Sequence, residues 1–198
     1  GIALLRGNQA VRDSFRLANL SMLLQQISTK QLPRRLLECS GSQVQVRPAG
    51  AHRSPWNVYS ANTESGIGRW RAFQIAFLLM SLDGVARGDS PDREIVDLIW
   101  FPTGGGKTEA YLGVIAFYLF HERFLMSDRD PLRRDGTNAL MRYTLRMLTT
   151  QQFQRAASLI CAMEFLRRNS QVAGVRSIPG SRFSLGLWIG GDGSPNKI

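Results

Sequence analysis

The sequence predicts an α/β fold in which helices flank a parallel β-sheet. The apolar stretch at 95–101 has the length and composition of a strand buried on both faces. Two further apolar stretches follow at 139–143 and 183–189, and segments of helical character separate the three. The alternation of strand and helix is typical of parallel sheets with right-handed crossovers.

The chain opens with helical patterns that precede the predicted sheet. Apolar residues recur at helical intervals over 8–26, and a shorter helix is predicted at 32–38. Residues 40–68 are rich in Ser, Pro, Asn and Gly, which indicates a linker, and 44–46 can add one edge strand within it. We therefore divide the chain into a helical segment with its linker, 1–62, and the first part of an α/β domain, 63–198.

Three helices are predicted around the strands. They cover 70–83, 109–124 and 144–168. The helix at 109–124 is apolar nearly all round, so we expect it to lie against the sheet and to be covered on its other side.

Three consecutive glycines at 104–106 join the first predicted strand to the next helix. Glycines let successive backbone N–H groups converge on a phosphate, and the helix N-terminus adds free amides and partial positive charge. Lys107 can reach the outer phosphates and Thr108 can hold Mg²⁺, so the pattern predicts an ATP-Mg²⁺ site with Lys107 as its catalytic residue. Phe101 stands where the strict pattern has a glycine, and the alternative is a turn that only joins strand to helix.

The charge of the chain favours a polyanionic partner. The net charge is +10, and 22 of the 25 basic residues are arginine, which binds phosphate through a bidentate fork. DNA is therefore an expected partner, although genomic base composition can also raise the arginine content. Cys39 and Cys161 are far apart and no apolar run is long enough to span a bilayer, so we expect a cytoplasmic protein without a membrane segment.

Four stretches resemble the motifs of superfamily 2 helicases and translocases. PTGGGKT at 102–108 resembles motif I, and WRAFQ at 70–74 resembles the glutamine element that precedes it. LMRYTLRMLTTQQ at 140–152 is similar to motif Ia with a tyrosine in place of its proline, and LWIGG at 187–191 is similar to motif Ib without its threonine. The sequence of residues 69–195 resembles that of the large helicase-like subunit of the DISARM bacterial anti-phage systems.

The resemblance implies a partial RecA-like domain of an ATP-driven motor that acts on DNA, beside other subunits of a defence complex. It implies that Gln74 reads the adenine edge, a task that suits an amide. The implied cofactor-binding residues are Gln74, Thr103, Gly104, Gly105, Gly106, Lys107, Thr108 and Glu109, the role of Glu109 being open. The implied nucleic-acid contacts are Arg142, Thr144, Arg146, Gly190 and Gly191.

The acidic pair of such motors, usually within D-E-x-H, does not occur in this sequence. We therefore expect the opening part of a motor domain, inactive alone, that depends on carboxylates and arginine fingers elsewhere. Two alternatives stay open: a basic, P-loop-shaped module that binds DNA or a partner subunit without hydrolysis, and a small-substrate phosphotransferase.

Overall fold

A computed structural model of the chain describes residues 1–30, 36–40, 43–47, 68–100, 104–125, 136–143 and 150–188. Four helices make up most of the described part: α2 (Gln9–Lys30), α4 (Ala72–Ala86), α5 (Lys107–Leu125) and α6 (Thr150–Arg168). Shorter elements accompany them: α1 (Ile2–Gly7), the 3₁₀ turns η1 (Pro91–Glu94) and η4 (Ser170–Ala173), and strands β1 (Leu36–Ser40) and β2 (Gln43–Arg47).

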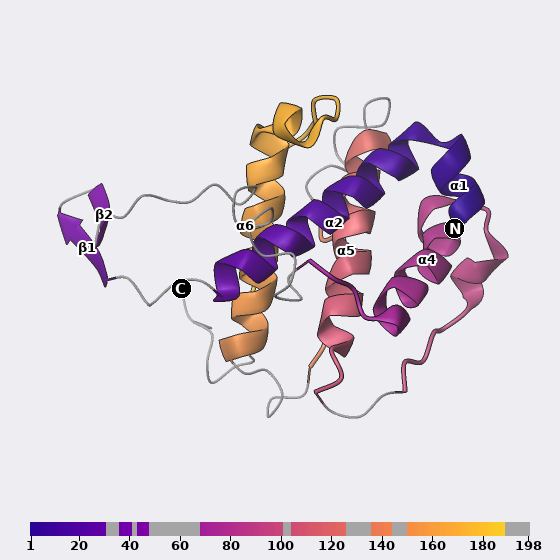
Figure 1. The fold of residues 1–198 in the computed structure, drawn as a ribbon, viewed down its shortest axis with the longest axis horizontal. Coiled ribbons are helices and arrows are strands. Elements are labelled where there is room, and N and C mark those ends of the chain that lie inside the picture. The colour runs from indigo at the N-terminus through magenta and orange to yellow at the C-terminus, as the bar shows by residue number, and fades with distance from the viewer. Residues whose placement is uncertain are drawn as a thin grey trace.

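Helix α5 is the central element of the helical assembly. It contacts α2, α4 and α6, and Figure 1 shows it between these helices. Its aromatic side chains Phe117 and Phe120 are fully buried, and they share one core with Leu17 and Met22 of α2 and with other buried residues of α4 and α6. The all-round apolar character of α5 is thus satisfied by helices on several sides.

Local chemistry accounts for the ends of two helices. The Asn8 side chain accepts a hydrogen bond of 3.1 Å from the Val11 N–H, the interaction of a residue that caps a helix N-terminus. After α6 and η4, Gly174 adopts a left-handed conformation with φ 62°, which ends the helical run.

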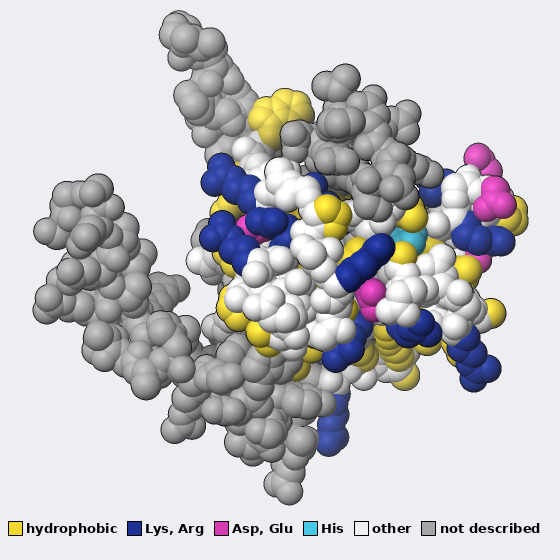
Figure 2. All heavy atoms as spheres, turned by 90° about the horizontal axis from the view of Figure 1, so that it is seen from above, with side chains coloured by type: hydrophobic (Ala, Val, Ile, Leu, Met, Phe, Trp, Pro, Cys, Tyr) yellow, Lys and Arg dark blue, Asp and Glu magenta, His cyan; other side chains and the backbone are white. Residues whose placement is uncertain are grey.

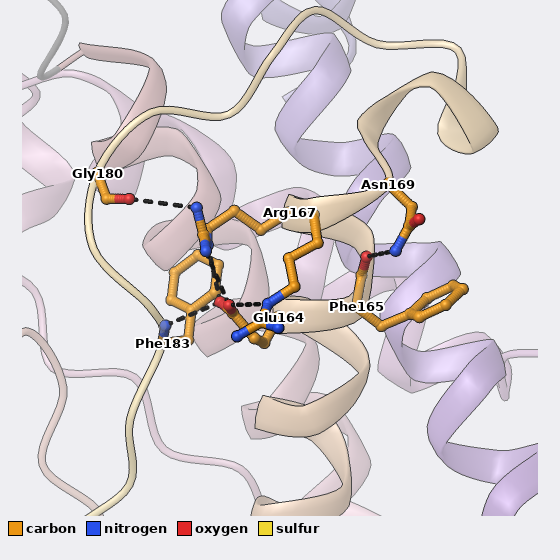
Figure 3. Close-up of polar contacts among 7 residues, drawn as sticks. Glu164, Phe165, Arg167, Asn169, Gly180 and Phe183 are labelled. Carbon is orange, nitrogen blue, oxygen red and sulfur yellow. Dashed lines mark hydrogen bonds and ion pairs between the residues drawn. The ribbon is translucent and has the colours of Figure 1, made fainter.

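The segment after η4 folds back onto α6. The Glu164 carboxylate of α6 accepts hydrogen bonds from Arg167 and from the Phe183 N–H, at 2.7 and 3.2 Å (Figure 3). The Phe183 ring meets Phe120 edge-on at 5.4 Å between centroids, which adds an apolar contact to the polar ones. One carboxylate therefore ties the 174–188 segment to the helical core.

Several of the sequence predictions are confirmed. The structure has helices where they were predicted at 8–26, 70–83 and 109–124, and α6 covers the described part of the one predicted at 144–168. Strand β2 contains the predicted edge strand at 44–46. The helix predicted at 32–38 is wrong from residue 36 onward, because Leu36–Ser40 pairs as strand β1 with β2, antiparallel, with Leu36 opposite Arg47.

The predicted α/β fold, a partial RecA-like domain with a parallel sheet, is wrong. In the described residues the β1-β2 pair is the sole sheet. Residues 95–100 are free of regular secondary structure, and Val96 and Trp100 are 93% and 88% exposed. The described parts of the other two predicted strands, 139–143 and 183–188, are also outside any sheet.

The physical reason is that an apolar run specifies at most a local backbone conformation. A sheet also needs hydrogen-bonding partners from distant segments, and these are absent among the residues that the structure describes. The helix that we expected to cover a sheet packs on α2, α4 and α6.

Candidate phosphate-binding site

A glycine turn leads directly into the N-terminus of α5. Gly104 and Gly106 have φ values of +83° and +88°, a region that residues with a Cβ rarely adopt. The following residue, Lys107, is the first of a 19-residue helix, whose initial N–H groups lack partners within the helix. Backbone donors and the positive end of a long helix thus meet at this turn.

The first turn of α5 carries Lys107, Thr108 and Glu109, all of which are half-buried. An ammonium, a hydroxyl and a carboxylate therefore lie within one helical turn of the glycines. The ammonium can neutralise a phosphate, and the hydroxyl can contribute an oxygen ligand to a cation. The carboxylate can form an ion pair with a neighbouring basic side chain.

Helix α4 contacts the glycine turn through two side chains at its N-terminus. Gln74 Nε2 donates a hydrogen bond of 2.8 Å to the Gly106 carbonyl, and Arg71 donates one of 2.7 Å to the Gly105 carbonyl. A Cβ at Gly106 would lie 2.7 Å from Gln74 Nε2, so the close approach requires glycine. The structure therefore places Gln74 against the glycine turn, whereas the predicted role of Gln74 was to read the adenine edge.

Helix α6 places a second arginine, Arg155, near the glycine turn. Arg155 forms an ion pair with Glu109, with 3.1 Å between Nη1 and Oε1. The other oxygen of Glu109 would lie 3.5 Å from a Cβ at Gly106. Glu109, whose role the sequence leaves open, thus holds a guanidinium beside the loop.

The described part of the second motif-like segment reaches the same region. Burial raises the pKa of the Tyr143 hydroxyl, the charge of Tyr111 adds to the rise, and Arg155 opposes it. Tyr143 itself is half-buried. Its neighbour Arg142, a predicted nucleic-acid contact, is exposed to solvent.

The structure thus brings together seven of the predicted site residues: Gln74, Gly104, Gly105, Gly106, Lys107, Thr108 and Glu109. Five other predicted residues lie outside the described ones: Thr103, Thr144, Arg146, Gly190 and Gly191. No sequence motif assigns a role to Arg71 or Arg155. Arg71 stands in the WRAFQ stretch and could have been found there, whereas a single arginine in α6 gives no signal in the sequence.

Basic side chains are more frequent than acidic ones on the face that Figure 2 displays, in keeping with the net charge of +10. Across the described part of the chain, no three Asp, Glu, His or Cys side chains converge as metal ligands. The same described residues contain no helix with the length and apolar character needed to traverse a bilayer.

Over 130 residues the chain is 48% identical to the DISARM protein DrmA of Bacillus paralicheniformis. The chain resembles a DISARM protein. The match covers 65% of this chain and 11% of DrmA, so the chain corresponds to a small part of that protein's length. No family model matches the chain, and no solved structure does.

Proposed function

We propose that this chain supplies the ATP-phosphate-binding element of a motor that acts on DNA in anti-phage defence. One observation carries the proposal: two glycines with positive φ lead into the N-terminus of α5 beside Lys107. This arrangement provides converging backbone donors, partial helix charge and one ammonium for an anionic tail.

The glycine turn and the first two residues of α5 have distinct roles in binding the phosphates. The amides near Gly104–Gly106 bind phosphate oxygens, and Lys107 stabilises the charge on the outermost phosphate. Thr108 offers a hydroxyl oxygen near the same phosphates, and Thr103, a predicted binding residue, lies outside the described residues. Mg²⁺ bound with ATP would neutralise phosphate charge, and the Thr108 hydroxyl is the group that suits it as a ligand.

The role in defence rests on the similarity to DrmA, whose name places that protein in DISARM. We extend this role to the present chain, together with other subunits of a defence complex as its partners. DNA binding is supported by the net charge of +10 and by the exposed Arg142. Substitution of Arg142 by Gln is expected to weaken binding similarly for all DNA sequences. The slope of the logarithm of the binding constant against the logarithm of the salt concentration should become shallower by about one.

The test uses the full-length protein with Lys107→Ala. We expect ATP hydrolysis in the presence of double-stranded DNA to fall by about a hundredfold or more, because an ammonium is lost where phosphate charge develops. Protection of cells against phage should be lost with it. Lys30→Ala, at the last residue of α2, is a chemically matched control that should keep both activities.

The outcomes separate the candidate functions. If Lys107→Ala leaves ATP hydrolysis by the full-length protein and phage protection unchanged, this chain is better described as a binding module that does not take part in hydrolysis. Hydrolysis that depends on Lys107 but is indifferent to DNA would favour a small-substrate phosphotransferase and would contradict the motor.

A further inference from the structure

Gln74 is 5% exposed, and both ends of its amide group are engaged within the protein. Its Oε1 accepts a hydrogen bond of 2.9 Å from the Arg71 N–H, just before α4 begins. Its Nε2 donates to the Gly106 carbonyl at 2.8 Å. The side chain thus joins the start of α4 to the last residue of the glycine turn.

These contacts control the direction of peptide groups. Arg71 and Gln74 donate to two consecutive carbonyls, those of Gly105 and Gly106. The C=O and N–H of one peptide group point in opposite directions, so a donor that holds the carbonyl also fixes the N–H on the other side. Held in this way, the amides that follow Gly105 and Gly106 keep a fixed orientation before any anion arrives.

The packing leaves little space for another arrangement. Gly106 has a φ of +88°, and a Cβ built there would be 2.7 Å from Gln74 Nε2. Because the glutamine amide is buried, a loop movement that broke its hydrogen bond to the Gly106 carbonyl would leave a buried donor unpaired.

We infer that Gln74 and Arg71 are positioning residues that orient the glycine loop for a polyphosphate, and that Gln74 does not select the base. This inference rests on the proposed phosphate site and differs from the adenine-reading role that the sequence resemblance implies. The site therefore recognises the triphosphate tail, and inorganic tripolyphosphate should respond to these two residues as ATP does.

The experiment measures binding of Mg-ATP and of Mg-tripolyphosphate to the full-length protein. Gln74→Glu keeps an acceptor for the Arg71 N–H but places a carboxylate oxygen opposite the Gly106 carbonyl, where a donor is needed. We expect both ligands to bind about tenfold more weakly, by the same factor. Arg71→Ala changes a solvent-exposed side chain, and should weaken both about threefold. Gln171→Glu, at an exposed position of η4, is the matched control and should change neither.

Amide hydrogen exchange of the ligand-free proteins gives a second readout. Residues 104–107 should exchange faster in Gln74→Glu and Arg71→Ala than in wild type or in the control. A loss of ATP affinity with unchanged tripolyphosphate affinity would show base reading and overturn the inference. Unchanged binding of both ligands in the two variants would overturn it as well. If wild type binds neither ligand, the proposed function fails, and the exchange rates alone decide whether the two residues position the loop.

Discussion

Substitution of Glu164 by Gln should loosen the segment that folds back onto α6. The carboxylate accepts hydrogen bonds from Arg167 Nε at 2.7 Å and from Arg167 Nη2 at 2.8 Å (Figure 3). It accepts another from Arg168 Nε at 2.8 Å. It also accepts the Phe183 N–H at 3.2 Å. A glutamine has one acceptor oxygen and no charge, so it cannot replace these interactions.

The magnitude follows from the pKa of Glu164. The hydrogen bond from Arg167 is the largest influence, and the pKa falls from 4.5 to about 2. Linkage converts this shift into an upper limit of roughly 3 kcal/mol for the ionised carboxylate. Arg168 is 66% exposed and its pairing is screened by water, so we expect a loss of about 1–2 kcal/mol.

Hydrogen exchange of the Gly180–Phe183 amides in the full-length protein measures this loss. Near pH 7 the variant should exchange about 5–30-fold faster than wild type, the ratio that corresponds to the expected loss. A depressed pKa gives stability that is complete above pH 4.5 and is lost as the pH falls toward 2. Near pH 3 the free-energy difference between the variant and wild type should therefore be less than half of the difference near pH 7.

Glu94→Gln at an exposed position of η1 is the control, and should exchange like wild type in this segment. Equal exchange of the Glu164 variant and wild type near pH 7 would refute the assignment of Glu164 as the anchor. A difference that stays constant down to pH 3 would refute its electrostatic origin.

Three other predictions follow from the structure. Gly106→Ala should speed amide exchange of the glycine loop about tenfold or more, because the new Cβ would clash with Gln74 Nε2 and the backbone has a φ of +88°. Gly104→Ala, also at positive φ but with open space around its Cβ, should have a smaller effect. Gly88→Ala, which is neither crowded nor at positive φ, is the control for both. Burial lowers the pKa of His121 from 6.5, so the unfolded chain takes up the proton more readily and the folded state loses stability as the pH falls below about 6.5. The opening of α5, measured as its amide exchange relative to the intrinsic rate of an unfolded chain at each pH, should therefore rise. His121→Gln should lack this rise, and a rise that persists would assign it to another group. Arg168→Gln should change local stability by less than about 1 kcal/mol in the Gly180–Phe183 exchange assay, and a larger change would contradict the screening of that ion pair.

Helices were the part of the fold that the sequence could predict. The spacing of apolar residues in α2, α4 and α5 is a local property that the structure keeps. The prediction of a parallel sheet was wrong because strand pairing depends on segments that are distant in the sequence. The run at 95–100 is as apolar as a buried strand, yet Val96 and Trp100 are almost wholly exposed. The mistaken helix at 32–38 has the same cause, since Leu36–Ser40 takes its conformation from pairing with β2.

The candidate site shows the same division between local and distant information. Gly104–Gly106 and Lys107 were found from adjacent residues, because a glycine turn before a helix can be seen in the sequence. Gln74 was found through resemblance, and the structure adds its hydrogen bond to Gly106. The ion pair of Arg155 with Glu109 joins two helices, and no short sequence pattern predicts it.

Calorimetric titration of the full-length protein with Mg-ATP tests the phosphate site most directly. We expect one binding event in wild type that weakens at least tenfold in Lys107→Ala and is unchanged in Lys30→Ala, since an ammonium near phosphate contributes strongly to affinity. Absence of binding in wild type, or equal affinity in the Lys107 variant, would contradict the assignment of this glycine loop as a nucleotide phosphate site.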